Sequence, residues 1–140
     1  MRLLVDTNII LEVLLGQDSA AQAQALLSSA EHELHLSDFS LHSIGLILFQ
    51  RQQAAAFEEF VTDMIAGGTL KILSLPASSL AALGEASARF NLDFDDAYQY
   101  VLAEAHELAI VSFDADFDRT ALGRKTPAQI AAQTDATDEG

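Results

Sequence analysis

The stretch "IVSFDADFDR", residues 110–119, joins an apolar segment to a run of closely spaced carboxylates. The apolar segment stops at Asp114, and Asp116 and Asp118 follow at alternate positions. The N-terminal stretch "MRLLVDTNII" has the same form, because its apolar segment runs directly into Asp6. Short apolar runs bounded by polar residues are typical of buried strands. The sequence therefore predicts two strands that each end in an acidic residue.

The composition limits the class of protein. A chain of 140 residues is expected to form one domain with a core that needs no cross-links. It has no cysteine, which excludes disulfide bonds and thiolate metal sites. No apolar run approaches the roughly 18 residues of a membrane span, and no signal peptide opens the chain. We therefore expect a soluble cytoplasmic protein with no membrane partner.

The formal net charge of −14, with only seven basic residues, argues against a broad nucleic-acid-binding face. Such acidity can reflect carboxylates gathered around a metal ion or a basic partner protein. It can also serve solubility alone, which is the simplest of the three explanations.

Strands and helices are expected to alternate along the chain. Strands are predicted at residues 2–5, around 35–36, at 70–75 and at 108–113. Helices are predicted at 8–16 (with Thr7 or Asn8 as the cap), 19–30, 40–50, 54–68, 78–90 and from 93 onwards. This alternation favours an α/β fold, a three-layer α/β/α sandwich around a central, mostly parallel sheet. The predicted domain covers residues 1–125, and residues 126–140 are expected to form a short helix from Thr126-Pro127 and a disordered acidic tail.

In parallel sheets, ligands bind beyond the carboxyl ends of the strands. Asp6 and Asp114 each follow a predicted strand, and Asp96 lies in the first turn of a predicted helix, where the helix dipole favours an anion. If these carboxylates converge, each pair at ~4 Å repels by about 4 kcal/mol at an effective dielectric near 20. Only protons or a cation can neutralise such a group. A ligand set made of oxygen alone suits Mg²⁺ or Mn²⁺.

The same acidic residues have purely structural interpretations. Asp93, Asp95 and Asp96 can cap a helix, and Asp114 and Asp116 can form a turn after a strand. A turn is equally possible at Asp6, and His42 and His106 lack the paired spacing of a zinc site.

A calcium-binding loop is excluded by two residues. Asp114, Asp116 and Asp118 imitate the start of such a loop. Its sixth position, however, is Arg119 instead of Gly, and its twelfth is Lys125 instead of Glu.

Two longer stretches carry a family resemblance. "LLVDTNIILEVLL" (3–15) and "DFDDAYQYVLAEAHELAIVSFDADF" (93–117) resemble the two signatures of PIN domains, the fold of the VapC-like toxin ribonucleases. The resemblance implies a metal-dependent endoribonuclease that hydrolyses RNA with Mg²⁺ or Mn²⁺. It also implies an antitoxin protein or a second copy of the chain as possible partners.

The resemblance assigns roles residue by residue. Asp6, Asp96 and Asp114 match the catalytic, metal-binding carboxylates, Asp116 matches a less regular acidic partner, Asn8 matches a support for Asp6, and Ser112 stands where the family often has Thr. Arg119, Arg124 and Lys125 are candidates for guiding the RNA backbone, although a solvated basic patch is the simpler interpretation.

One position departs from the family pattern. The segment "LSDFSLHSIGLIL" (36–48) matches a pattern like Ser-x-x-Thr-x-x-Glu-Leu, and Ser43 occupies the Glu position. Asp38 and His42 lie nearby but not in that position. The loss of one carboxylate predicts weaker cation binding. The alternative function is therefore a weakly active or inactive PIN module that binds RNA or a protein partner.

Overall fold

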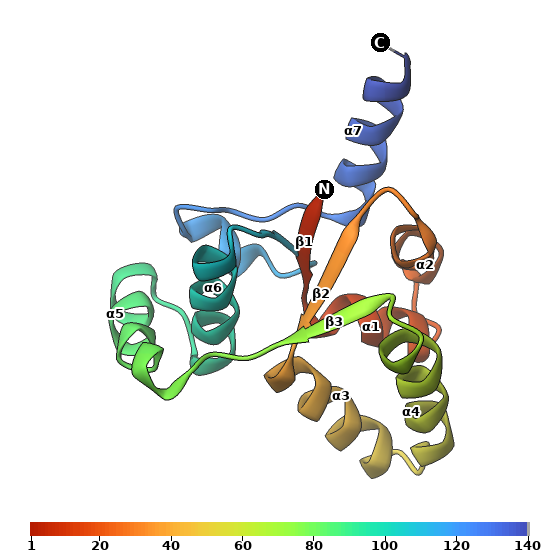
Figure 1. The fold of residues 1–140 in the computed structure, drawn as a ribbon, viewed down its shortest axis with the longest axis horizontal. Coiled ribbons are helices and arrows are strands. Elements are labelled where there is room, and N and C mark those ends of the chain that lie inside the picture. The colour runs from red at the N-terminus through yellow and green to blue at the C-terminus, as the bar shows by residue number, and fades with distance from the viewer. Residues whose placement is uncertain (140) are drawn as a thin grey trace.

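A computed structural model describes residues 1–139, of which 136–139 are described by their backbone alone. Its centre is a four-stranded sheet in the order β3-β2-β1-β4, in which every pairing is parallel. The strands are β1 (Arg2–Val5), β2 (Glu33–Ser37), β3 (Leu70–Leu73) and β4 (Ala109–Val111). The three-layer α/β/α fold predicted from the sequence is confirmed (Figure 1).

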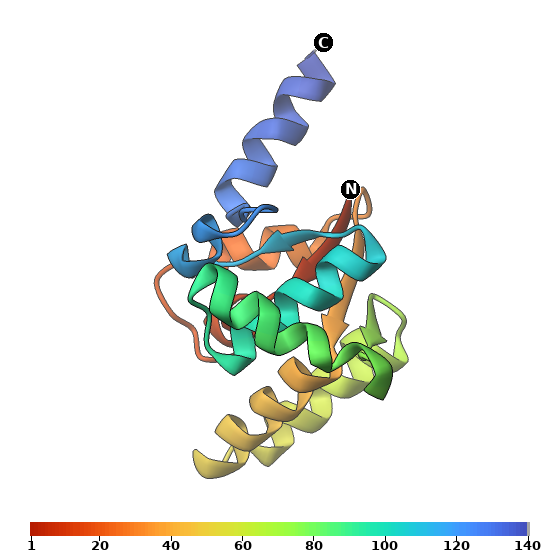
Figure 2. The ribbon, with the colours of Figure 1, turned by 90° about the vertical axis from the view of Figure 1, so that its left-hand side faces the viewer.

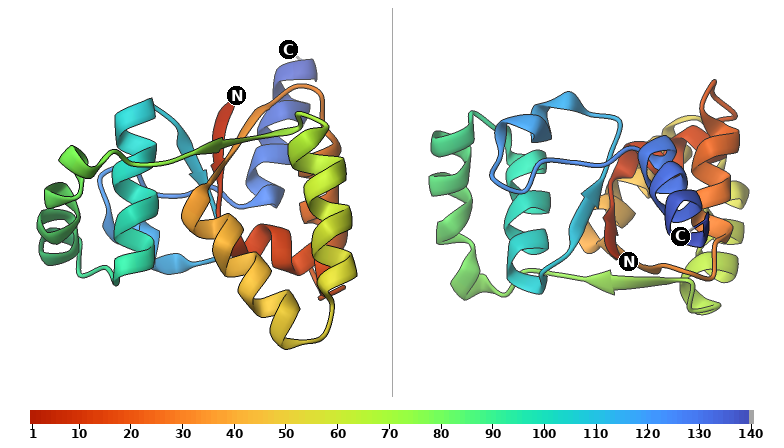
Figure 3. Two further views of the ribbon diagram at one scale, coloured as in Figure 1. Left: turned by 60° about the horizontal axis from the view of Figure 1, so that its bottom comes forward. Right: turned by 90° about the horizontal axis from the view of Figure 1, so that it is seen from above.

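Helices cover both faces of the sheet (Figure 3). They are α1 (Thr7–Leu14), α2 (Ala20–Ser28), α3 (Asp38–Gln50), α4 (Ala54–Phe60), α5 (Ala81–Phe90), α6 (Phe94–His106) and α7 (Pro127–Glu139). The predicted helix over 54–68 changes to π-helical geometry at Val61–Ala66, and a 3₁₀ turn at Ala77–Ser79 precedes α5. No helix among the described residues is long and apolar enough to cross a membrane.

Alternation along β1 separates two cores. Leu3 and Val5 belong to the core beneath α1 and α2, whereas Leu4 belongs to the core beneath α5 and α6. Successive side chains of a strand point to opposite faces, so a fully apolar β1 is buried on both sides. This explains why the strand before Asp6 has no polar residue after Arg2.

Several predicted boundaries differ from the structure by a few residues, and two of them lie at the ends of β1 and β4. The cap of α1 is Asp6 instead of Thr7 or Asn8, because the Asp6 carboxylate accepts a hydrogen bond from the Thr7 amide at 2.8 Å. The last strand, Ala109–Val111, is shorter than the predicted 108–113. At its end, Val111 forms a separate parallel bridge with Lys125, whose carbonyl accepts from the Ser112 amide.

Helix α7 begins at the predicted Thr126-Pro127 start and packs on α2, extending away from the sheet (Figure 2). Thr126 and Gln129 form a reciprocal cap, in which each side chain accepts a hydrogen bond from the other residue's backbone amide. The helix runs further than the short one expected there, while the predicted domain boundary at residue 125 stays a prediction.

We predict that Phe117→Ala lowers the free energy of unfolding by about 3–5 kcal/mol, because Phe117 is fully buried and its loss leaves a cavity. Urea denaturation measures the change. Leu122→Ala, at an exposed site on the same segment, is the control and should cost less than about 1 kcal/mol. Similar losses for both variants would show that Phe117 does not anchor the segment after β4.

Candidate metal centre

Three carboxylates meet at the carboxyl end of the sheet. Oxygen atoms of Asp96, Asp114 and Asp116 all lie within 4.8 Å of one another. Asp96 comes from the first turn of α6, and the other two come from the segment directly after β4. No cysteine or histidine belongs to this group, so its ligand atoms are all oxygens. The donor set therefore fits a hard divalent cation such as Mg²⁺ or Mn²⁺.

Local hydrogen bonds fix the backbone that carries these acids. Asp93 is the N-cap of α6, and its side chain accepts from the Asp96 amide at 3.0 Å. The Asp114 carboxylate accepts from the Asp116 amide at 2.8 Å and so caps the 3₁₀ turn Ala115–Arg119. The structural roles expected for Asp93 and Asp114 are thus present. Asp114 therefore forms the turn and also belongs to the group of clustered carboxylates.

Asp6 lies beside this group and is 8% exposed. One carboxylate oxygen accepts from the Thr7 amide at 2.8 Å and from Gln99 Nε2 at 3.2 Å, and the other accepts from Ser112 Oγ at 2.6 Å. All three donors are neutral. The hydrogen bonds therefore hold Asp6 in place without cancelling its charge.

Ser112 and Asn8 connect the ends of β1 and β4. Ser112 Oγ donates to Asp6 and accepts from the Asp114 amide at 2.9 Å and from Asn8 Nδ2 at 3.2 Å. The Asn8 Oδ1 accepts from the Phe113 amide at 3.3 Å. These bonds make Asp6 and Asp114 parts of one rigid unit. Ser112 thus contacts Asp6 directly, and Asn8 reaches it through Ser112.

The environment raises the carboxyl pKa values of Asp96 and Asp6, and burial together with Asp93 raises that of Asp95. The pKa of Asp96, which is 7% exposed, rises to about 7, first through burial and then through the charges of Asp93, Asp114, Asp6 and Asp116. Burial also raises the pKa of Asp6, against the hydrogen bonds from Ser112, Gln99 and Thr7. Near neutral pH, the Asp96 carboxyl group can therefore either keep its proton or release it when a cation binds.

Gln99 and Ser40 are members of the network that the sequence analysis missed. Gln99, 3% exposed, donates from Nε2 to Ser40 Oγ at 2.8 Å as well as to Asp6. Ser40 Oγ also accepts from Thr7 Oγ1 at 2.8 Å. The available signal was a polar residue three positions after Asp96, which places it on the same side of α6 as Asp96.

Ser43 lies half-buried on α3, one helical turn beyond Ser40.

The three basic residues that are candidates for binding RNA already contact other groups of the protein. Arg119 pairs with Asp116 at 3.3 Å, Arg124 pairs with Asp118 at 3.2 Å and donates to the Ser112 carbonyl, and Lys125 Nζ donates to Gln133 Oε1.

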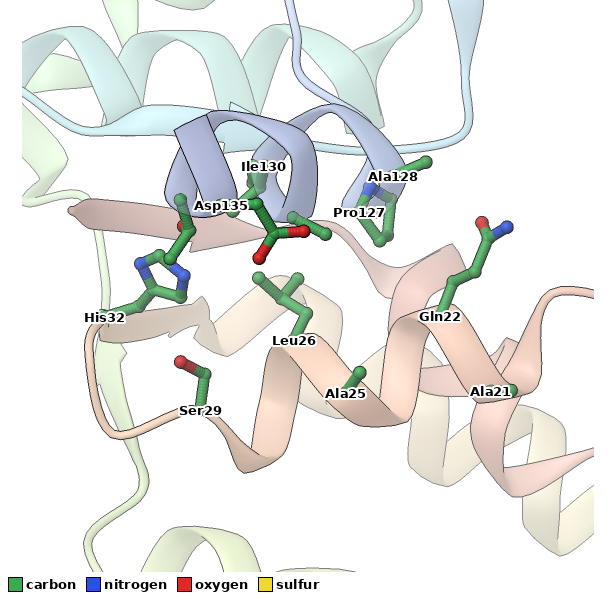
Figure 4. A pocket seen from close by; sticks show the side chains of 12 residues that line it. Ala21, Gln22, Ala25, Leu26, Ser29, His32, Pro127, Ala128, Ile130 and Asp135 are labelled. Carbon is green, nitrogen blue, oxygen red and sulfur yellow. The ribbon is translucent and has the colours of Figure 1, made fainter. Parts of the chain in front are cut away.

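A separate surface pocket of about 460 Å³ lies between α2 and α7 (Figure 4). Its walls are mainly apolar and include Ala25, Leu26 and Ile130. None of the clustered carboxylates lines it, so it is distinct from the candidate metal centre.

Comparison with known proteins gives the family context. A family model described as the PIN domain matches residues 3–122. Among solved structures, VapC20 of Mycobacterium tuberculosis, described as a Sarcin-Ricin loop cleaving toxin, is 18% identical with a TM-score of 0.73, covering 86% of this chain and 95% of its own. PAE2754 from Pyrobaculum aerophilum is 19% identical with a TM-score of 0.70, covering 97% and 96%. A toxin-antitoxin complex from Klebsiella pneumoniae is 18% identical with a TM-score of 0.69, covering 89% and 96%. A search of curated proteins found no match.

We predict that Asp96→Asn stabilises the metal-free protein relative to wild type, and increasingly so as the pH rises. Between about pH 4, near the ordinary aspartate pKa, and pH 7, the unfolded chain has lost the Asp96 proton while the folded chain keeps it. The unfolded state then binds fewer protons, so wild-type stability falls as the pH rises through this window and the loss is complete above it.

Urea denaturation in EDTA at pH 4.5, 6 and 8 measures the difference between Asp96→Asn and wild type. Asp95→Asn, on the same helical turn but outside the clustered group, is the matched control. The pKa of Asp95 is also raised, by burial and by Asp93, but without the charges of Asp6, Asp114 and Asp116, so this variant should show a smaller pH dependence. A difference between Asp96→Asn and wild type that stays constant with pH would contradict the raised pKa.

Proposed function

The chain belongs to the PIN-domain family, and we propose that it is a metal-dependent endoribonuclease that hydrolyses RNA phosphodiester bonds. The observation that carries the proposal is the group formed by Asp96, Asp114 and Asp116, with the buried Asp6 beside it. Three acids held this closely repel one another unless a cation or protons neutralise them. The all-oxygen donor set favours Mg²⁺ or Mn²⁺ as the cofactor.

Each acid has a role in binding in this proposal. Asp96, Asp114 and Asp116 hold the cation, and Asp6 adds negative charge from the buried side of the site. A bound divalent ion supplies Lewis-acid stabilisation of the phosphate charge and activation of water. Ser112 and Asn8 keep Asp6 and Asp114 at a fixed separation, so that the acids bind the cation without first rearranging.

The second candidate is a weakly active or inactive PIN module that binds RNA or a protein. Ser43 favours it, because a hydroxyl stands where the family pattern has a carboxylate. One anionic ligand fewer lowers the attraction for a hard cation, although Mg²⁺ tolerates the loss by keeping several waters.

We also propose an antitoxin protein as a partner. Similar structures include toxin-antitoxin complexes, among them the one from Klebsiella pneumoniae. A net charge of −14 suits a basic partner protein. The same proposal includes RNA as the substrate, self-association into a homodimer and a cytoplasmic location.

We predict that the wild type cleaves a single-stranded RNA oligonucleotide with millimolar Mn²⁺ and that Asp114→Asn cleaves at least about 100-fold more slowly, because one anionic oxygen of the site is lost. Gel analysis of end-labelled RNA measures the rate, and EDTA should abolish it. Asp118→Asn is the matched control, since Asp118 is exposed and pairs with Arg124. Equal cleavage by the Asp114→Asn and Asp118→Asn variants, or by wild type in EDTA, would point to a contaminating nuclease.

We predict that Ser43→Glu binds Mn²⁺ more tightly than wild type and cleaves the RNA faster, because it restores a carboxylate at the position where the family pattern has Glu. Titration calorimetry measures the affinity. His42→Glu adds the same charge one residue away and controls for a general electrostatic effect. If Ser43→Glu gains neither affinity nor rate over His42→Glu, Ser43 does not mark a lost ligand, and the binding-module candidate gains support.

A further inference from the structure

We infer that Gln99 is a positioning residue of the metal centre, whose amide nitrogen holds Asp6 and whose amide oxygen remains at the site as an additional acceptor. The inference rests on the proposed function, because it concerns the cation that the carboxylates would bind. Gln99 belongs to the middle of α6, three residues after Asp96, and is 3% exposed.

The orientation of the Gln99 amide follows from its neighbours. Nε2 lies 3.2 Å from Asp6 Oδ1 and 2.8 Å from Ser40 Oγ. An ionised carboxylate only accepts hydrogen bonds, so the amide nitrogen has to face Asp6. The opposite orientation would place two oxygens against each other. Gln99 is therefore fixed as a donor to Asp6, which also accepts a hydrogen bond from Ser112, the residue directly after β4.

The other end of the amide has no partner. Gln99 Oε1 is buried and accepts no hydrogen bond from any residue that the structure describes. An acceptor left unpaired in a protein interior lowers stability, and an apolar side chain would avoid this loss. The neighbouring buried positions Leu102 and Ala103 are indeed apolar. An unpaired oxygen on the amide whose nitrogen holds Asp6 is explained if a water of the hydrated cation provides the donor.

The position of Gln99 also bears on the carboxylate that the family pattern has at Ser43 and this chain lacks. Its second acceptor, Ser40, lies on α3 one turn before Ser43. The Gln99 amide thus extends from α6 to the part of α3 where the family pattern carries a Glu and this chain carries a hydroxyl. In this chain, the neutral amide of Gln99 on α6 thus contacts the turn of α3 that precedes Ser43.

Calorimetric titration of Mn²⁺ into the full chain tests the inference. Gln99→Met keeps the size of the side chain and removes both polar ends, and it should weaken Mn²⁺ binding about 10-fold or more. Tyr98→Phe is the matched control. It removes a hydroxyl on the same helix that bonds to Asp38 and Leu75, and its Mn²⁺ affinity should stay within about twofold of wild type.

Thermal unfolding gives a second readout that does not depend on activity. Gln99→Glu keeps an oxygen at this position and adds a charge next to Asp6, so its melting temperature in EDTA should fall below that of wild type. Mn²⁺ should then raise the melting temperature of Gln99→Glu by more than it raises that of wild type. An equal rise would show that the cation does not reach position 99 and would overturn the inference, as would unchanged Mn²⁺ affinity in Gln99→Met.

These outcomes separate the inference from the proposed function. If wild type binds Mn²⁺ and Gln99→Met binds it equally well, only the role of Gln99 is wrong. If wild type binds no Mn²⁺ at millimolar concentration, the metal-dependent function and the role of Gln99 are both wrong.

Discussion

The parallel pairing of β1 with β2 on one side and β4 on the other is the constraint on which the site depends. Parallel strands end at the same edge of the sheet. Residues that follow the ends of two neighbouring strands therefore lie close together, even when they are about 100 positions apart in sequence. The register aligns Val5 with Val111, and the next residues, Asp6 and Ser112, then meet at 2.6 Å. Burial of β1 on both faces keeps this register fixed, because a slip by one residue would exchange its two apolar faces between the cores.

That constraint brings like charges together, and the surrounding groups determine how the protein tolerates them. Asp6 is held by three neutral donors, which fix its position, while burial raises its pKa. Asp96 responds by a rise of its pKa to about 7. Asp116 has a cationic neighbour in Arg119, which also bonds to the carbonyls of Phe90 and Asn91. Asp96 and Asp116 thus balance negative charge in two different ways, Asp96 by a raised pKa and Asp116 by a nearby arginine.

The fold and part of the site follow from local patterns in the sequence. Asp6 and Asp114 could be placed at strand ends because an apolar run stops at each, and the parallel arrangement then brings those ends to one edge. Gln99 could not be assigned a role in this way, since its role depends on how closely α6 approaches Ser40 on α3. The same limit applies to the pairing of Arg119 with Asp116, which depends on the geometry of a 3₁₀ turn that no apolar pattern predicts.

The placement of the basic residues bears on how an acidic chain can meet RNA. Arg119 and Arg124 pair with Asp116 and Asp118, so their charges are largely balanced within the protein. With a net charge of −14, the long-range field repels a polyanion. In the proposed nuclease, attraction for the phosphate then has to come from the divalent ion itself, which reverses the local sign of the potential. Cation binding would therefore control substrate binding as well as hydrolysis, and a site with one carboxylate fewer than the family pattern leaves more of the ion's positive charge available to the phosphate.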